Sequence, residues 1–345
     1  MKEYEIVIVG AGPAGLRCAE ILAKNKRKVL VLEKNKVIGD KVCAGGITRK
    51  IIDLVPDNIL QRKFKKIIFH TPLQDAEIKQ EKPFIATILR RDLGNWQAKQ
   101  ARKAGTKILL NSEVTKIDKN IIIINNKEKV EYKYLVGADG HNSIVRKYLN
   151  LKIENFGQAF QYITKKKFNN LEVFIDPEKY GSFYLWIFPY KTSSSIGAGE
   201  DLSKKIKQPV LNLKLSEIKS NLDNFCKKRL EINKAKFQAC MINYDYKGYQ
   251  FNNIFLCGEA AGFVSGLTGE GICWAIKSGE DIANKIINEE YKCKNIKHIL
   301  RIKELEENFM RTLEINKKMT EVEWEMFNFL LKIKWLGDKF IEDVD

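Results

Sequence analysis

The stretch KEYEIVIVGAGPAGLRCAEILAKNKRKVLVLEK, residues 2–34, decides the fold. A β-branched run at residues 5–9 predicts a short buried strand, and the glycine-rich turn GAGPAG follows it at once. Residues 16–24 then predict a helix, and residues 28–32 predict a second buried strand that ends on Glu33. A strand, a tight turn, a helix and a strand in this order form a βαβ unit, so the sequence predicts an α/β fold with a parallel sheet.

The glycines and the acid of this unit predict a dinucleotide site. Gly10 allows a tight turn, Gly12 lets a pyrophosphate approach the backbone, and Gly15 allows close packing of the helix on the sheet. Phosphates would lie at the helix N-terminus, which favours anions. Glu33 can accept hydrogen bonds from a ribose diol and disfavours a 2′-phosphate, so FAD and NAD fit and NADP does not. A glycine turn in another kind of parallel α/β protein is the weaker alternative.

The size and charge of the chain limit the classes of function. Its 345 residues suffice for two associated domains or one large α/β unit. The formal net charge of +17 fits nucleic acid, an anionic lipid surface, acidic substrates or an acidic electron carrier, although genomic base composition explains it equally well. We expect no nucleic-acid partner, because the sequence has no recognition helix, RNA-binding signature or compact basic run.

The seven cysteines predict neither a metal site nor a disulfide framework. No C-x-x-C pair is present, so iron–sulfur and zinc spacings are absent. The odd number of cysteines and the lack of a signal peptide favour the reducing cytoplasm. No apolar run approaches the length of a bilayer span, so we expect a protein that is soluble or peripheral at a membrane.

Two later loops carry residue types that suit a flat ligand. In KVCAGGIT, residues 41–48, adjacent glycines beside Cys43 let a backbone pass close to such a ligand, and an ordinary glycine loop around a buried thiol is the alternative. In GADGHNSIVR, residues 137–146, a strand ends on Asp139, whose carboxylate can reach the crevice at the end of the sheet. A capped turn without a ligand is the alternative.

A third dense stretch is NIFLCGEAAGFVSGLTGEGICWAI, residues 253–276. A buried strand delivers Glu259 into a loop, and Gly269 and Gly271 begin a long helix that runs to Ile287. The N-terminus of that helix can stabilise a reduced, anionic flavin ring, and Glu259 can hold a ribityl hydroxyl.

Strands of a second sheet are predicted at residues 66–71 and 84–89. The helix that follows begins with Arg90 and Arg91, which can clamp a phosphate or pair with Asp92.

Aromatic residues concentrate between residues 151 and 249, where alternation predicts an antiparallel sheet. In YLWIFP the side chains of Tyr184, Trp186 and Phe188 lie on one face of a strand that Pro189 ends. This face is either core or one wall of a pocket for a long hydrophobic substrate.

The last segment, residues 295–345, is predicted to be helical and is strongly apolar from residue 321 to residue 340. Trp335 is among its apolar residues, and its narrow polar stripe consists of Glu325, Asn328, Lys332 and Lys339. Docking across the two domains is the slightly favoured interpretation. The alternative is a helix that lies in a membrane interface.

Taken in order, these motifs resemble the geranylgeranyl reductases, which belong to a flavoprotein group that includes aromatic hydroxylases. The resemblance covers roughly residues 2–287. It implies a Rossmann-like FAD-binding domain with a mainly parallel sheet, an antiparallel-sheet substrate domain and a C-terminal helical segment. The predicted boundaries are 1–63, 90–155 and 249–292 for the FAD-binding domain, 64–89 and 156–248 for the substrate domain, and 293–345 for the helical segment.

The resemblance also implies roles for individual residues. The residues predicted to line the substrate pocket, and to act in catalysis, are Cys43, Tyr184 and Trp186. The residues predicted to bind FAD are Gly10, Gly12, Ala14, Gly15, Glu33, Lys34, Cys43, Ala44, Gly45, Arg91, Asp139, Gly258, Glu259, Gly269, Gly271 and Ile272. The chain departs from the family pattern at Gly181 and Gly266, where proline is usual, and at Glu259, where aspartate is usual.

The activity that the resemblance implies is reduction of isolated carbon–carbon double bonds of geranylgeranyl chains, in prenyl (ether) lipids or prenyl diphosphates, by reduced FAD. The electron donor is a ferredoxin or NAD(P)H; the single dinucleotide unit and the basic surface favour ferredoxin. The alternatives are a flavin monooxygenase or halogenase-like enzyme and a quinone-linked electron-transfer flavoprotein. A halogenase would be favoured by Trp-x-Trp-x-Ile-Pro, and this chain has Tyr184 and Phe188 in the related positions.

Overall fold

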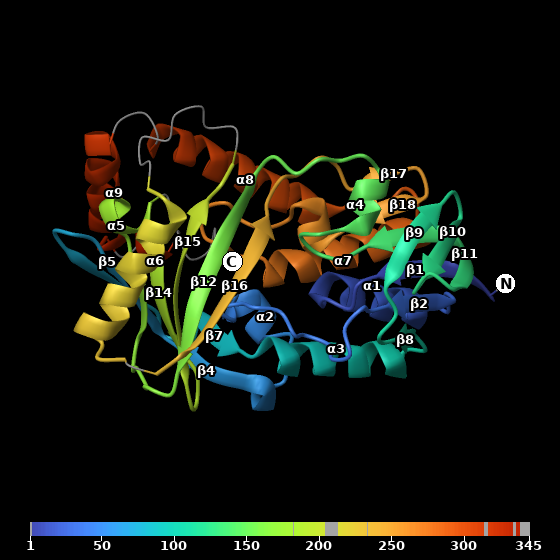
Figure 1. Cartoon of the computed structure of the whole chain (residues 1–345), viewed down its shortest axis with the longest axis horizontal. Helices are drawn as coiled ribbons and strands as arrows, with labels where there is room; N and C mark the ends of the chain where they lie inside the picture. The colour runs from blue at the N-terminus through green and yellow to red at the C-terminus, as the bar shows by residue number, and fades with distance from the viewer. Residues whose placement is uncertain are drawn as a thin grey trace. The chain divides into compact units, whose positions relative to one another are not determined.

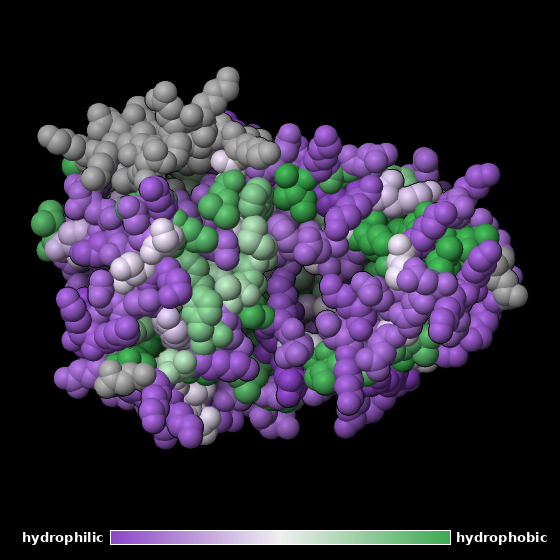
Figure 2. Space-filling view, in the orientation of Figure 1, coloured by the Kyte–Doolittle hydropathy of each residue, from purple (hydrophilic) through white to green (hydrophobic). Residues whose placement is uncertain are grey.

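The computed structural model of the chain (Figure 1) describes residues 2–181, 183–203, 213–232, 234–313, 317–333 and 336–338. Two compact units are present. The first comprises Met1–Lys41, Arg90–Glu154 and Ile242–Lys303, and the second comprises Val42–Leu89, Asn155–Met241 and Glu304–Asp345. Hydrophilic side chains cover much of the face shown in Figure 2, as the net charge of +17 leads one to expect.

The first unit is built on a mainly parallel sheet. Its strands lie in the order β17-β18-β11-β1-β2-β8, with an antiparallel extension from β11 through β10 to β9. The strands are β1 (Lys2–Val9), β2 (Val29–Leu32), β8 (Lys107–Leu109), β9 (Val114–Asp118), β10 (Ile121–Ile124), β11 (Glu128–Gly137), β17 (Gln250–Phe251) and β18 (Ile254–Leu256). The central positions of β1 are fully buried, because strands between two parallel neighbours and helices have no solvent-facing side.

Helices pack against this sheet. They are α1 (Pro13–Lys24), α3 (Arg90–Lys103), α4 (Ile144–Tyr148) and α7 (Ile272–Ile287), with a short 3₁₀ helix η3 (Gly258–Ala261). Helix α1 contacts both α3 and α7 (Figure 1). Glycines permit this close packing: a Cβ on Gly279 of α7 would lie 2.3 Å from the carbonyl oxygen of Ala14.

The second unit contains a sheet in the order β16-β12-β15-β14-β13-β5-β6, in which only β13 and β5 are described as a parallel pair. The strands are β5 (Lys66–His70), β6 (Asp75–Lys79), β12 (Phe156–Thr164), β13 (Leu171–Phe174), β14 (Leu185–Pro189), β15 (Ser194–Asp201) and β16 (Lys236–Asn243). A small sheet holds β3 (Gly46–Thr48), β7 (Ile85–Ile88) and β4 (Leu60–Phe64); short helical segments are α2 (Arg49–Ile52), η1 (Asp57–Ile59) and α5 (Pro177–Tyr180).

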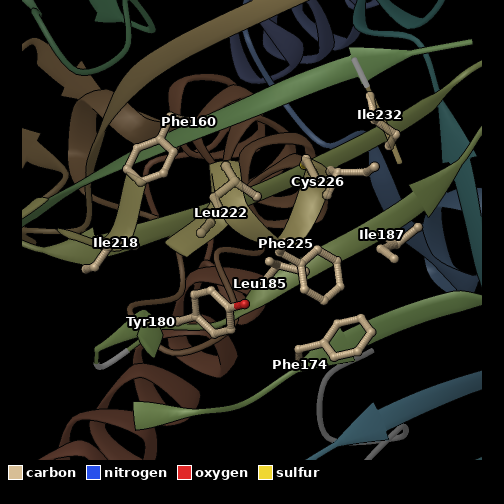
Figure 3. Close-up of a cluster of buried hydrophobic side chains, with 12 residues drawn as sticks. Phe160, Phe174, Tyr180, Leu185, Ile187, Ile218, Leu222, Phe225, Cys226 and Ile232 are labelled. Atoms are coloured by element: carbon tan, nitrogen blue, oxygen red, sulfur yellow. The ribbon is translucent and has the colours of Figure 1, made fainter. Parts of the chain in front are cut away.

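One face of the large sheet is covered by α6 (Leu215–Asn224) and the following π-helical turn η2 (Phe225–Arg229). Figure 3 shows Leu185 and Ile187 of β14 in a buried cluster with Leu222 and Phe225. Because side chains alternate along a strand, Trp186 and Phe188 belong to the opposite face of the sheet.

Helices α8 (Lys294–Leu313) and α9 (Lys317–Leu331) follow. Helix α9 docks on the turn between β5 and β6, beside which Figure 1 shows it in dark red. The carboxylate of Glu325 accepts hydrogen bonds from Thr71 Oγ1 at 2.8 Å and from the N–H of Leu73 at 2.9 Å. Asn328 Nδ2 donates to the carbonyl oxygen of Gln74 at 3.0 Å. Trp335 and Lys339, which the predicted helix included, lie outside the described residues.

The predicted fold class is confirmed, and two details differ. The strands predicted at residues 66–71 and 84–89 do not share one sheet, because β5 pairs with β6 and β13 whereas β7 pairs with β3 and β4. The compact units place residues 42–63 and 304–345 with the second sheet, whereas the predicted boundaries assigned them to the FAD-binding domain and the C-terminal segment. The assignment of these parts to FAD binding and to substrate binding stays a prediction.

Candidate functional site

The glycine turn after β1 combines two glycines that packing requires with one that packing does not require. Gly10 has a φ of 102°, and a Cβ there would lie 2.4 Å from the carbonyl oxygen of Ala138; a Cβ on Gly15 would lie 2.2 Å from the carbonyl oxygen of Gly10. By contrast, a Cβ on Gly12 would meet only that Ala138 oxygen, at 3.8 Å. The space beside Gly12 is therefore not filled by other protein atoms, and a ligand can approach the backbone there.

The N-terminus of α1 faces this open backbone. Pro13 is its first residue, and the N-cap Gly12 supplies no side-chain hydrogen bond, so N–H donors of the first turn are left for a ligand. Glu33, at the end of β2, holds the turn in place: its Oε2 accepts the N–H of Ala11 and its Oε1 accepts the N–H of Asn35, both at 2.9 Å. This donor set fits a pyrophosphate followed by a ribose.

Asp139 carries a buried oxygen that points to a ligand. It follows β11, and its Oδ2 accepts the N–H of Ile144 at 2.7 Å at the start of α4. Its Oδ1 is buried and lacks a hydrogen-bond partner within the described part of the chain. Burial raises the pKa of Asp139, against hydrogen bonds from Ser143 and Ile144 that lower it. An unpaired buried oxygen is costly, so a ligand hydroxyl or amide fits here.

The loop after β18 meets the other two loops of the first unit. Gly258 has a φ of 57°, and a Cβ there would lie 2.9 Å from the Cβ of Ala14 in α1. A Cβ on Gly140, next to Asp139, would lie 3.3 Å from Glu259 Oε2. The structure thus brings together the three loops that the sequence predicts for FAD. These contacts join residues more than a hundred positions apart.

Glu259 forms an ion pair that the sequence did not reveal. Its Oε2 contacts the ammonium of Lys41, and its Oε1 accepts the N–H of Asn243 at 3.2 Å. Asn243 Nδ2 also donates to the carbonyl oxygen of Glu259 at 2.8 Å. The glutamate side chain is 9% exposed, so the lysine neutralises a nearly buried carboxylate.

The N-terminus of α7, predicted to stabilise a reduced flavin, has one donor of its first turn occupied by a side chain of the protein. The N–H of Cys273 donates to Glu270 Oε1 at 2.8 Å, so a carboxylate already occupies one donor of the first turn. Gly269 has a φ of 68° in the loop before it, Gly271 is the N-cap, and Ile272 is buried. A role for the helix dipole at a flavin is weakened accordingly.

Two predicted cations lie toward solvent. Arg91 Nη2 is 3.4 Å from Asp40 Oδ1, and both side chains are more than half exposed, so this pair contributes little to stability. Lys34 is exposed. Their contacts with FAD stay predictions.

In the second unit, the loop of Cys43 packs against the aromatic strand. Tyr190 donates its hydroxyl to the carbonyl oxygen of Ala44 at 2.7 Å, and the N–H of Gly45 donates to Cys43 Sγ at 3.3 Å. Gly45 has a φ of 72°. A Cβ on Gly46 would lie 2.7 Å from the ring of Phe188, so only glycine allows this approach.

A chain of hydrogen bonds connects Trp186 to the Cys43 loop. Trp186 Nε1 donates to Ser195 Oγ at 2.9 Å, and Ser195 Oγ donates to Gln161 Oε1 at 2.8 Å. Gln161 Nε2 in turn lies 3.4 Å from the carbonyl oxygen of Cys43, which accepts its hydrogen. Gly197 leaves room for the Trp186 ring, since a Cβ there would lie 2.2 Å from Cζ2. Sequence reasoning missed Ser195, Gln161 and Gly197; their only signal is the alternation of β12 and β15.

The three aromatic residues are not equally exposed. Trp186 is 8% exposed, whereas Tyr184 and Phe188 are half-buried. Tyr184 precedes the strand, and its ring centroid lies 6.1 Å from that of Trp186 at an interplanar angle of 68°. Trp186 is therefore the anchored member of the wall, and its neighbours present the accessible surface.

The departures from the family pattern have unequal explanations. Gly181 has a φ of 65°, which proline cannot adopt, and a Cβ there would lie 2.0 Å from Glu200 Oε2. Nothing in the structure explains glycine at Gly266, where a Cβ would lie 3.7 Å from the ring of Tyr244, an ordinary contact.

No group of three or more His, Cys, Asp or Glu side chains with the geometry of a metal site occurs among the described residues. Within the same residues, no helix has the length and apolar character needed to cross a bilayer.

The parallel sheet and the three converging loops define a flavoprotein, an oxidoreductase whose cofactor is FAD. The chain belongs to the family described as FAD binding domain, whose model matches residues 3–292.

Two relatives are similar to the chain over most of its length. An uncharacterized protein of Methanosarcina barkeri is 32% identical over 85% of this chain and 76% of its own. A digeranylgeranylglycerophospholipid reductase of Methanococcus vannielii is 29% identical over 85% of this chain and 79% of its own. The resemblance to geranylgeranyl reductases is thereby confirmed.

Two solved structures share the fold. A geranylgeranyl bacteriochlorophyll reductase-like protein of Thermoplasma acidophilum has a TM-score of 0.74 at 21% identity, covering 91% of each chain. The p-nitrophenol 4-monooxygenase of Pseudomonas putida has a TM-score of 0.77 at 17% identity, covering 100% of this chain and 98% of its own. At such identities the likeness shows the fold alone.

Proposed function

We propose that this flavoprotein reduces isolated carbon–carbon double bonds of geranylgeranyl chains carried by prenyl lipids or prenyl diphosphates. The observation that carries the proposal is the hydrogen-bonded connection from Trp186 through Ser195 and Gln161 to the Cys43 loop. It joins the two features that the family resemblance assigns to the substrate. The relative from Methanococcus vannielii, named as a reductase of a geranylgeranylated phospholipid, supports this choice.

The residues of the first unit would bind the pyrophosphate, the adenosine ribose and the ribityl chain of FAD. The bare backbone of Gly12 and the N–H groups of α1 bind the pyrophosphate, Glu33 binds the adenosine ribose, and the unpaired Oδ1 of Asp139 accepts a hydrogen bond from FAD. Glu259 would hold a ribityl hydroxyl while Lys41 neutralises its charge. When bound, FAD supplies the hydride for the double bond.

The aromatic face of the second unit would bind the prenyl chain. Tyr184 and Phe188 offer half-buried apolar surface, and Trp186 is held in one orientation by Ser195. Each methylene removed from water contributes about 0.8 kcal/mol, so a long chain binds without many polar contacts. Cys43 would touch the substrate, and its loop would help to exclude water.

The electron donor is proposed to be a small acidic protein of the ferredoxin type. The net charge of +17 favours such a partner, and residues 2–34 carry the one dinucleotide fingerprint that the sequence shows, so NAD(P)H would need a transient site of another kind. Stopped-flow flavin bleaching tests this: rapid reduction by reduced ferredoxin is expected. Rapid bleaching by NADPH with none by ferredoxin would reverse the assignment.

A monooxygenase is the second candidate, because p-nitrophenol 4-monooxygenase has the same fold and the fold alone does not separate the two activities. The two candidates differ in what the reduced enzyme does with oxygen. Rapid formation of a hydroperoxyflavin spectrum on mixing with oxygen would favour the monooxygenase.

The deciding experiment is anaerobic incubation of dithionite-reduced holoenzyme with unsaturated archaeal-type prenyl ether lipids and, separately, with prenyl diphosphates. Mass spectrometry should show products heavier by two hydrogens per double bond. A Trp186→Ala variant should lose product formation, whereas Phe237→Ala, at an exposed position of β16, should not. No mass gain with either substrate class would refute the proposed reaction.

A further inference from the structure

Helix α9 has an inward face that is largely polar where it meets the β5–β6 turn. Asn328 is 0% exposed and Thr320 is 1% exposed, and both lie on the side that carries the buried Trp324. Glu325 and Asn328 hold the turn through hydrogen bonds to Thr71, Leu73 and Gln74. These bonds fix the rotation of the helix about its own axis.

The outward face of α9 is apolar. Apolar side chains recur on this face at helical spacing, and the last of them lies just beyond the end of α9. The exposed fractions are 66% for Val322, 57% for Met326, 57% for Phe329, 38% for Leu330 and 39% for Ile333. Leu73 on the β5–β6 turn is 84% exposed and lies beside this face, because its N–H donates to Glu325. We call these six residues the α9 patch.

Helix α9 is therefore apolar on two sides, because Trp324 and Leu331 are buried while the α9 patch is exposed. An ordinary surface helix has one apolar stripe, which faces the core. Rolling α9 to bury the patch would break the hydrogen bonds of Glu325 and Asn328. A contiguous apolar patch that the fold holds outward marks an interaction surface.

The charge of the chain distinguishes between partners. A second copy would bring its own net charge of +17 against this one, whereas an anionic bilayer attracts it. In the sequence, Lys317 and Lys318 begin α9, and the exposed Lys332 follows its last residue. Lysines at both ends of an apolar stripe are typical of a helix that lies in a membrane interface.

We propose that the α9 patch inserts into the surface of an anionic lipid bilayer, with α9 parallel to the membrane plane. The aromatic and aliphatic side chains would enter the boundary between headgroups and acyl chains, and the exposed Lys332 would contact a lipid phosphate. The proposal rests on the proposed function only in suggesting why a membrane is useful, since prenyl lipids reside there. Vesicle binding can be measured without any activity, so the two proposals fail independently.

The test is flotation of the full-length holoenzyme with vesicles of phosphatidylglycerol and phosphatidylcholine, and with vesicles of phosphatidylcholine alone. Binding to the anionic vesicles is expected, with at least a tenfold loss in the double variant Met326→Ser/Phe329→Ser. The matched control is Phe237→Ser, which removes an exposed aromatic from β16 and should change binding less than twofold. FAD content and melting temperature should match the wild type in both variants.

Two outcomes would overturn the proposal. One is anionic-vesicle binding that is absent, or that the double variant retains in full. The other is a concentration-dependent dimer, seen by sedimentation velocity without lipid, that the double variant abolishes; the patch would then be an interface between two copies.

Discussion

The ammonium of Lys41 is paired with Oε2 of Glu259, whose side chain is 9% exposed, at the position where the related reductases usually have aspartate. This pairing joins two loops that lie 218 positions apart in the sequence. The backbone N–H of Asn243 fixes the other carboxylate oxygen. The lysine thus neutralises a nearly buried acid in a loop that is predicted to hold the cofactor.

Replacing Lys41 by methionine should weaken FAD binding about tenfold, or about 1.4 kcal/mol, because the nearly buried carboxylate of Glu259 would lose the cation that neutralises it. Fluorescence titration of the apoprotein measures the dissociation constant. Lys103→Met, on the exposed end of α3, is the control and should bind FAD as the wild type does. Equal affinities for the two variants would rule out the role given to the ion pair.

Alanine at Gly12 and at Gly15 should have opposite consequences. The added methyl at Gly12 meets no protein atom closer than 3.8 Å, so the stability of the apoprotein should change by less than about 1 kcal/mol. FAD affinity should nevertheless fall about a hundredfold, equivalent to about 2.7 kcal/mol. At Gly15 the methyl would lie 2.2 Å from a carbonyl oxygen, so the apoprotein itself should be destabilised. Urea unfolding of both apoproteins and FAD titration separate the two effects; unimpaired FAD binding by Gly12→Ala would contradict the pyrophosphate assignment.

Ser195→Ala should disturb the orientation of Trp186 in the proposed substrate site without affecting FAD binding. It removes the partner of both Trp186 Nε1 and Gln161 Oε1, and leaving such buried groups unsatisfied costs about 1–3 kcal/mol. We expect a several-fold lower kcat/KM for the prenyl substrate with an unchanged rate of flavin reduction by dithionite. Thr192→Ala, on an exposed turn nearby, serves as control. A normal kcat/KM in Ser195→Ala would show that the hydrogen-bonded connection is dispensable.

Stability should depend on pH through His70. Its Nδ1 lies 2.7 Å from Asp75 Oδ1 and its Nε2 lies 3.3 Å from Glu172 Oε2, and its ring stacks on Phe174. Burial alone would lower the pKa of His70, but the two carboxylates outweigh burial and raise it. The folded state therefore binds the proton more tightly than the unfolded state does. The stabilisation is complete below the ordinary pKa of about 6.5 and is lost as pH rises through the raised value.

The measurement is the free energy of unfolding of the wild type and of His70→Gln between pH 5.5 and 8.5. The difference between them should shrink as pH rises. A constant difference would mean that the histidine contributes by packing rather than by charge.

Much of the cofactor site was predictable because its signals are local. Strand, glycine turn, helix and Glu33 fall within residues 2–34, and each has a steric or hydrogen-bonding reason that can be stated before any contact is known. The structure adds a local detail at α7: Glu270 lies one residue before the N-cap, and its carboxylate accepts the N–H of Cys273 in the first turn. The expected contact of this helix end with a flavin stays a prediction.

The sequence by itself determined the α/β class, a dinucleotide site that suits FAD or NAD, and the aromatic strand, because periodicity and glycine spacing are imposed within a few turns of chain. The choice of FAD came from the family resemblance. Only the tertiary structure decided that Lys41 meets Glu259, that Ser195 and Gln161 connect Trp186 to the Cys43 loop, and that the α9 patch stays exposed. Those relationships depend on which strands pair and which way a helix is rotated. Long-range packing sets both, and no local pattern encodes them.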